Sequence, residues 1–188
     1  MATALELLGT QASTCMACGL AATRNRVVFG SGPERAKVMV VGEAPGAHED
    51  LTGVPFVGRS GQLLDELLDE QGLERASLYV TSVVKCRPPG NRTPRVGEIA
   101  TCRGYLDQQL AEIDPVVVIS LGNTATRAVL RTAAPITSLR GAVHQEPGTG
   151  RAVVPTFHPA AGLRGGTKVV EQIREDLRRA AGVAREAS

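Results

Sequence analysis

Four short apolar runs constrain the fold of this chain more than any other feature. They cover residues 38–41, 78–84, 116–121 and 152–157, and such runs are typical of strands that are buried on both faces. Segments with the apolar spacing of amphipathic helices separate them, so consecutive strands need crossover connections and should pair in parallel. We therefore predict an α/β fold with three layers, α/β/α, around a central, mainly parallel four-stranded sheet.

The composition fits one globular domain. Of the 188 residues, 43% are hydrophobic, which is enough to bury a core, and no repeat or linker divides residues 1–188. No apolar stretch is long enough to span a bilayer, and the start of the chain lacks the basic and apolar regions of a secretory signal. We expect a monomeric cytoplasmic protein with no membrane partner. The net charge of +2 is too small to indicate a polyanion binder by itself.

The candidate metal ligands are four cysteines: Cys15, Cys18, Cys86 and Cys102. In a reducing cytosol such thiols bind a metal or stay free more often than they form disulfides. The first two form a Cys-x2-Cys pair, but 15 residues separate the other two, unlike the two close pairs of a zinc ribbon. Spacing therefore leaves zinc and an iron–sulfur cluster open, as well as two buried thiols beside a chance Cys-x2-Cys pair.

Polar residues stand at the carboxyl ends of the predicted strands. Glu43 follows the first strand, Ser82 lies near the end of the second, Asn123 follows the third, and His158 follows the fourth. In a parallel sheet these ends share one edge, where α/β proteins bind ligands. Each residue alone has an ordinary alternative, since His158 could satisfy a loop carbonyl and Glu43 could be a solvated acid. Together with basic loops they predict a pocket for a small planar polar group flanked by phosphates.

The segments between the strands give further expectations. A polar loop is expected around Glu49, and Thr93 followed by Pro94 predicts the start of a helix. Residues 135–150 are expected to form an irregular excursion, with a short extended run up to Gln145 and a turn at residues 147–150. Residues 158–166 are expected to form a loop before a closing amphipathic helix.

Three segments carry the most distinctive patterns: residues 42–64, 85–94 and 157–164. The first contains GEAPG, ED, TG, PFVG and GQLL, the second KCRPP, NR and a further proline, and the third FHPA and LR. In this order the segments resemble the motifs of the family 4 uracil-DNA glycosylases. The four cysteines are similar in order and approximate spacing to the ligands of that family's 4Fe–4S cluster. The resemblance covers nearly the whole chain and favours iron–sulfur over zinc.

The resemblance implies a DNA repair enzyme. Such glycosylases flip uracil, which is deaminated cytosine, out of DNA into a pocket and hydrolyse its N-glycosidic bond, leaving an abasic site. By analogy, His158 would donate a hydrogen bond to O2 of the departing uracilate, and Glu49 or Asn91 would orient the attacking water. The flipped base would stack on Phe56, in a pocket formed by Gly42, Glu43, Ala44, Gly46, Phe56 and Ser82.

The resemblance also implies contacts with DNA and with the cluster. Leu163 and Arg164 would lie in a loop that enters the DNA groove. The positive side chains that hold phosphates would be Lys85, Arg87, Arg92 and Arg140. A structural 4Fe–4S cluster on the four cysteines would tie the N-terminal segment to the middle of the chain.

Ser82 departs from the family pattern, which usually has an asparagine at this position. An amide has a donor and an acceptor in one plane, whereas a hydroxyl is shorter and rotates, so the base preference is expected to differ. Two other functions fit the residues. One is an iron–sulfur module that binds uracil-containing DNA without catalysis, and the other is a zinc-stabilised domain in which residues 42–46 hold a nucleotide phosphate.

Overall fold

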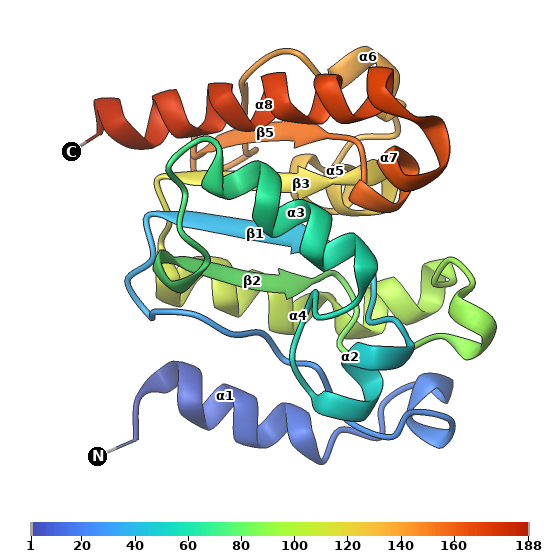
Figure 1. Ribbon diagram of the computed structural model, residues 1–188. Coiled ribbons are helices and arrows are strands. Elements are labelled where there is room, and N and C mark those ends of the chain that lie inside the picture. Colours follow the sequence, from blue (N-terminus) through green and yellow to red (C-terminus); the bar gives the residue numbers. More distant parts are fainter. Residues whose placement is uncertain (1, 188) are drawn as a thin grey trace.

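Residues 2–187 are described in the computed structural model, and they form a mixed sheet with helices on both faces (Figure 1). The sheet has five strands in the order β2-β1-β3-β5-β4. The four longer strands are parallel to one another: β1 (Val38–Gly42), β2 (Leu78–Ser82), β3 (Val117–Leu121) and β5 (Ala152–Thr156). The predicted positions of these four strands are therefore confirmed, apart from small differences at their ends.

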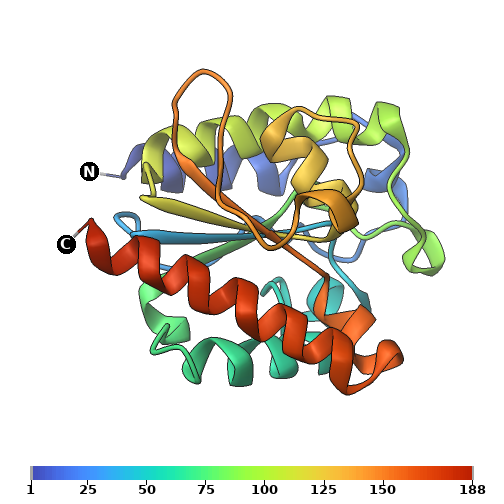
Figure 2. The same cartoon turned by 90° about the horizontal axis from the view of Figure 1, so that it is seen from above.

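Helices cover both faces of the sheet (Figure 2). One face packs against two long helices, α3 (Arg59–Asp69) and α8 (Thr167–Glu186). The other face packs against three helices, α1 (Ala4–Ser13), α4 (Val96–Ile113) and α5 (Gly122–Leu130). This arrangement agrees with the three layers predicted from the alternation of strands and helices.

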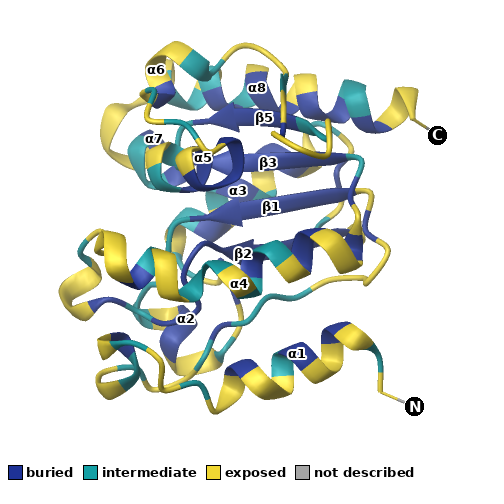
Figure 3. Cartoon of the chain, turned by 180° about the vertical axis from the view of Figure 1, so that it is seen from behind, coloured by how far each residue is buried: buried dark blue, intermediate teal, exposed yellow. Residues whose placement is uncertain are grey.

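The strands lie in the middle of the core (Figure 3). Every residue of β1, β2 and β3 is buried, as expected for parallel strands that are covered on both faces. Because side chains alternate along a strand, Met39 and Val41 pack on the side of α4, while Val38 and Val40 pack on the side of α3 and α8. The register of the parallel pairs brings their carboxyl ends to one edge of the sheet.

Three short elements differ from the prediction. β4 (His144–Gln145) pairs antiparallel with β5, so the sheet has five strands rather than four. α2 (Ala47–Thr52) replaces the expected polar loop, because the Glu49 side chain accepts the Gly46 N–H and so caps the helix. α7 (Pro159–Gly165) replaces the expected loop after β5, and Pro159 lies in its first turn. A proline is tolerated there because a backbone N–H in the first turn has no hydrogen-bond partner within the helix.

Other boundaries follow local hydrogen bonding. α4 begins at Val96 rather than at Thr93-Pro94, because the Glu98 carboxylate accepts the N–H of Arg95 at 2.7 Å and sets the first turn there. α6 (Ile136–Leu139) lies within the expected excursion. Three 3-10 turns complete the fold: η1 (Gly19–Ala22), η2 (Arg75–Ser77) and η3 (Pro89–Asn91). Within residues 2–187, none of the helices has the length and apolar character needed to cross a bilayer.

Candidate active site

A cavity of about 730 Å³ lies at the carboxyl ends of the parallel strands. Its wall contains Glu43 after β1, Ser82 at the end of β2, Gly122 at the start of α5 and His158 after β5. These residues come from four separate segments, and the register of the strands aligns them. The predicted meeting of four strand ends at one edge is confirmed. We call this cavity the rim pocket.

Two aromatic rings face each other in the rim pocket. The ring centroids of Phe56 and His158 are 5.8 Å apart, with planes 29° from parallel, and both residues line the cavity. Phe56 has a φ of 55°, a left-handed conformation that is costly for a bulky residue. A Cβ on Gly61 would lie 1.9 Å from the Phe56 carbonyl oxygen, and a Cβ on Gly42 would lie 2.5 Å from the ring. The two glycines therefore make room for this placement of Phe56.

The His158 imidazole is held in one orientation. Its Nδ1 accepts the N–H of Ala160 at 3.1 Å, which caps α7. An acceptor at Nδ1 of the neutral ring leaves the hydrogen on Nε2. Burial, followed by the positive charge of Arg164, lowers the pKa of His158 to about 4, although the negative charge of Glu49 opposes this shift. At pH 7 the ring is therefore neutral and offers one donor, Nε2–H.

Glu49 lies in the pocket wall and holds the turns on either side of Phe56. Its Oε1 accepts the N–H groups of Val57 and Gly58, both at 2.9 Å, and its Oε2 accepts the N–H of Gly46 at 3.0 Å. Both lone pairs of Oε1 are thereby used, whereas Oε2 keeps one. Because Glu49 lines the rim pocket, this remaining acceptor can bind a group inside it.

The other predicted wall residues take different positions. Ala44 and Gly46 line the rim pocket, whereas Gly42 lies behind the Phe56 ring. The Ser82 side chain is buried in the wall, and its Oγ lies 3.3 Å from the place of a Cβ on Gly42. Asn91 lies exposed at the pocket, with its Oδ1 accepting from Arg87 Nε at 2.7 Å. Of the two candidate acceptors for a water molecule, only Glu49 is therefore buried in the wall.

Two of the predicted DNA-contacting cations lie at the rim pocket. Arg92 and Arg164 line it, and Arg92 forms an ion pair with Glu98 at 2.7 Å. Arg164 is exposed on α7, next to Leu163, which is 46% exposed. α7 thus presents an apolar and a positive side chain beside the cavity.

Two residues of α5 were not anticipated from the sequence. Thr124 lines the rim pocket and donates a hydrogen bond to the Glu43 carboxylate. Arg127, one helical turn further on, also lines the pocket and is exposed. Their spacing of three residues places them on one helix face. This spacing could have identified both residues from the sequence, because the strand that precedes them was already expected to end at the pocket.

Lys85 and Arg140 do not reach the rim pocket, and the structure does not support their predicted phosphate contacts. The Lys85 amine is buried and donates to Thr81 Oγ1 and the Ser82 carbonyl, each at 2.7 Å, and to Gln109 Oε1 at 2.5 Å. Arg140 points toward α8 and is ion-paired there. A phosphate could reach either cation only if these hydrogen bonds were broken.

A second, small cavity is lined by four thiols, those of Cys15, Cys18, Cys86 and Cys102. We call it the cysteine cavity. All four cysteines are free, and burial raises the pKa of Cys86 to about 11. Within residues 2–187, no group of three or more His, Cys, Asp or Glu side chains is arranged to hold a metal ion. The convergence of four soft sulfur donors nevertheless fits an iron–sulfur cluster in its chemistry.

Sequence comparison relates most of this chain to known uracil-DNA glycosylases. The sequence profile of the Uracil DNA glycosylase superfamily matches residues 29–178. A type-4 uracil-DNA glycosylase of Thermotoga maritima is 42% identical over 178 residues, which cover 94% of this chain and 92% of that protein. A type-4 uracil-DNA glycosylase of Sulfurisphaera tokodaii is 40% identical, over 85% of this chain and 76% of that protein. A type-5 uracil-DNA glycosylase of Pyrobaculum aerophilum is 36% identical, over 80% and 73% respectively.

Proposed function

Because the chain belongs to the uracil-DNA glycosylase superfamily, and within it to the type-4 enzymes, we propose that it removes uracil from DNA and leaves an abasic site. The base must first leave the duplex, since an enzyme cannot reach the bond within the stack. The observation that carries the proposal is that Phe56 and His158 share one cavity. The reaction needs a stacking surface and a hydrogen-bond donor at the same base.

The rim pocket would bind the flipped base mainly through its shape. Phe56 offers a ring face for stacking, which any base can use. Specificity then depends on polar groups at the base edge, and the Ser82 hydroxyl is the candidate at the end of β2. The backbone of Ala44 and Gly46 would limit the size of the base. A hydroxyl can serve as donor or acceptor, so we propose that discrimination between uracil and other deaminated bases is weaker than with an amide.

His158 would stabilise the leaving group. When the bond between N1 of uracil and C1′ of the sugar breaks, the electron pair moves to the base and O2 gains negative charge. The Nε2–H of His158 would donate a hydrogen bond to O2, and a preorganised donor of this kind contributes about 3 kcal/mol to transition-state stabilisation. Ala160 holds the ring in the required tautomer before substrate binds, so no reorganisation is needed during the reaction.

Glu49 is our candidate for orienting the attacking water. The water adds its oxygen to C1′ and gives up one proton, which the free lone pair of Glu49 Oε2 can accept. The negative carboxylate would also stabilise the cation-like sugar. Asn91 is the alternative acceptor, although its amide oxygen is already paired with Arg87.

The surface around the rim pocket would hold the DNA backbone. Arg87, Arg92 and Arg164 are the predicted phosphate contacts that remain accessible, and we add Arg127 of α5. Such contacts make binding weaken as salt concentration rises. Leu163 would fill the space that the flipped base leaves in the stack.

We also propose that the cysteine cavity holds a 4Fe–4S cluster with a structural role. The four thiols come from the segment after α1, from the connection between β2 and α4, and from α4 itself. When bound, the cluster would supply cross-links between these segments rather than reaction chemistry.

The experiment that tests the proposed function uses an oligonucleotide with one uracil, treated with alkali after incubation. The wild-type protein should produce strand cleavage at the uracil, and His158→Ala should lower the single-turnover rate constant by about 10²–10³-fold. His48→Ala is the matched control, because His48 is exposed outside the pocket wall, and it should cleave normally. Binding of the oligonucleotide by the wild type without cleavage would instead identify a non-catalytic module.

A further inference from the structure

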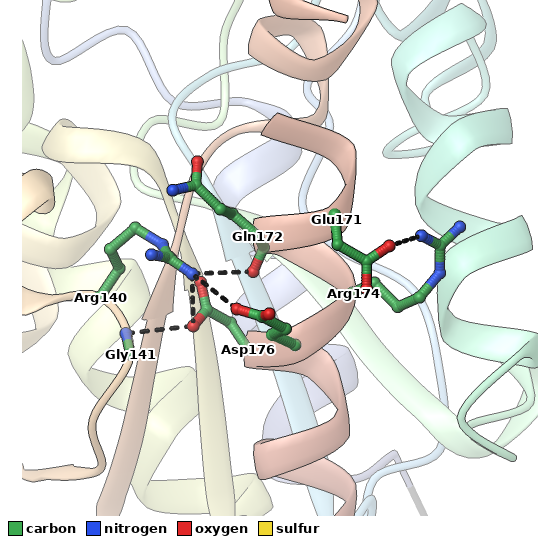
Figure 4. A network of polar contacts seen from close by, with 7 residues as sticks. Arg140, Gly141, Glu171, Gln172, Arg174 and Asp176 are labelled. Carbon is green, nitrogen blue, oxygen red and sulfur yellow. Dashed lines mark hydrogen bonds and ion pairs between the residues drawn. The ribbon is translucent and has the colours of Figure 1, made fainter. Parts of the chain in front are cut away.

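Arg140 is the centre of a polar cluster between α6 and α8 (Figure 4). Its Nε donates to Asp176 Oδ2 at 3.0 Å and its Nη2 donates to Asp176 Oδ1 at 3.2 Å. The same Nη2 donates to the Gln172 carbonyl, and the Gly141 N–H donates to Asp176 Oδ1, each at 3.0 Å. We call these four residues the Arg140 cluster. Because Asp176 is fully buried and holds the guanidinium through two oxygens, the position of Arg140 is closely defined.

The guanidinium of Arg140 also covers an aromatic ring of the pocket wall. Its Cζ lies 5.5 Å from the ring centroid of Phe157, within the range of a cation–π contact. Phe157 lines the rim pocket and directly precedes His158. A continuous series of contacts therefore runs from α8 through Arg140 and Phe157 to His158.

Several contacts set the position of the His158 backbone. The hydrogen bond from Ala160 sets the rotation of the imidazole, but it comes from the same short segment and moves with it. On one side Gly122 packs closely, since a Cβ there would lie 3.3 Å from His158 Cβ. The covalently adjacent Phe157 is held by Arg140, while α7, which follows His158, packs on α3 and α8.

We propose that Arg140 is a positioning residue, which keeps His158 at the donor site through its contact with Phe157. This inference rests on the proposed function, in which the His158 Nε2–H must meet O2 of the leaving base. A displacement of a catalytic group by about 1 Å can cost on the order of 10²-fold in rate. Arg140 thus acts on the reaction from inside the protein, without contact with a DNA phosphate.

Arg140→Lys is the informative variant, because lysine keeps the positive charge but loses the planar fork and the stacking face. Arg174→Lys is its matched control. Arg174 lies on α8, as Asp176 does, and also binds carboxylates, those of Glu70 and Glu171, but it faces away from Asp176 (Figure 4). Both variants should lower the free energy of unfolding modestly. Only Arg140→Lys should lower the single-turnover rate constant measured at saturating enzyme, by about 10-fold or more. Its affinity for abasic product DNA should be unchanged.

A second measurement follows the His158 ring itself. In an NMR titration, the His158 signal is identified by its loss in His158→Asn. A ring that is released from its buried position should titrate at higher pH, so the apparent pKa of His158 should rise toward 6.5 in Arg140→Lys and stay unchanged in Arg174→Lys. Arg164 and Glu49, the charged groups that act on His158, are intact in both variants.

The outcomes separate the two proposals. If the wild type cleaves and Arg140→Lys matches Arg174→Lys in rate and in the His158 titration, Arg140 is only a structural ion-pair partner and the inference is wrong. If the wild type does not excise uracil, the proposed function fails. The titration still decides in that case whether Arg140 positions His158.

Discussion

The rim pocket and the cysteine cavity share one connection, the segment from Ser82 to Cys86, yet they are held together differently. In the rim pocket the chain itself positions the functional groups. Glu49 accepts three backbone N–H groups and His158 accepts one. In the cysteine cavity, Cys86 and Cys102 each accept one hydrogen bond, at 3.5 and 3.3 Å, from Arg24 and from the Lys85 backbone.

This difference indicates that the rim pocket is preorganised by the polypeptide, whereas the order of the cysteine cavity would depend on the proposed cluster that joins its thiols. The N-terminal segment, which contains α1, Cys15 and Cys18, contacts the rest of the fold partly through packing of α1 on α4. A cross-link between that segment and α4 would therefore add stability. Changes in the two regions should accordingly have different effects, on stability at the cysteine cavity and on excision rate at the rim pocket.

The largest effect on stability is expected from Cys102→Ser. Loss of one ligand should release the cluster, and the free energy of unfolding should fall by at least about 3 kcal/mol, since a group bound at a hundred times its Kd contributes that much. Iron content and urea denaturation measure the two effects. Met16→Ala is the control, because Met16 lies between Cys15 and Cys18 but is 74% exposed. Wild-type protein that is free of iron and as stable as Cys102→Ser would contradict the cluster.

A smaller effect is expected from Gly42→Ala, behind the Phe56 ring of the rim pocket. The added methyl group would lie 2.5 Å from Phe56 Cζ, so the ring must move, at a cost of about 1–3 kcal/mol. Excision should slow because the stacking surface is displaced. Gly104→Ala on α4 is the control, since a Cβ there meets nothing within 4 Å, and it should stabilise the helix by about 0.5–1 kcal/mol. Unchanged excision and stability in Gly42→Ala would show that the pocket is not rigid.

The pH dependence of stability tests the state of His158. Its pKa is about 4 in the folded protein and 6.5 ordinarily, so between these values the unfolded chain binds a proton that the native state does not. Stability should therefore be fully present above pH 6.5 and should fall as the pH drops toward 4. The whole shift of the His158 pKa corresponds to about 3 kcal/mol in the free energy of unfolding. Because the ring is partly exposed, we expect a loss of about 1–2 kcal/mol in that free energy.

Urea denaturation at pH 7 and pH 4.5 measures this loss. His158→Asn is the comparison, because asparagine can still cap α7 but does not titrate. The difference in stability between the two pH values should be smaller in this variant. Equal differences in both proteins would mean that His158 titrates normally in the fold.

The smallest effect is expected from Ser82→Asn. The longer amide would extend from the end of β2 into the rim pocket and offer a donor and an acceptor in one plane. We expect excision of uracil to rise several-fold relative to excision of hypoxanthine, which corresponds to about 1 kcal/mol of discrimination. Identical rates for the two proteins on both bases would show that the residue at this position does not select the base.

The main elements could be predicted from the sequence, whereas the short ones could not. A strand that is covered on both faces needs a continuous apolar run, and β1 and β3 show one. β4 has only two residues, too few for any periodicity. α2 escaped prediction because its cap comes from the Glu49 side chain rather than from the residue before the helix.

The alternation of strands and helices along the chain already implies parallel pairing, and parallel pairing brings Glu43, Ser82 and His158 to one edge of the sheet. The directions of the long basic side chains, by contrast, depend on contacts that form only in the folded protein. Lys85 turns inward to Gln109 and Arg140 turns to Asp176, both partners that are distant in the sequence. The direction of a flexible charged side chain depends on which buried acceptors the fold brings within its reach, and no local pattern contains that information.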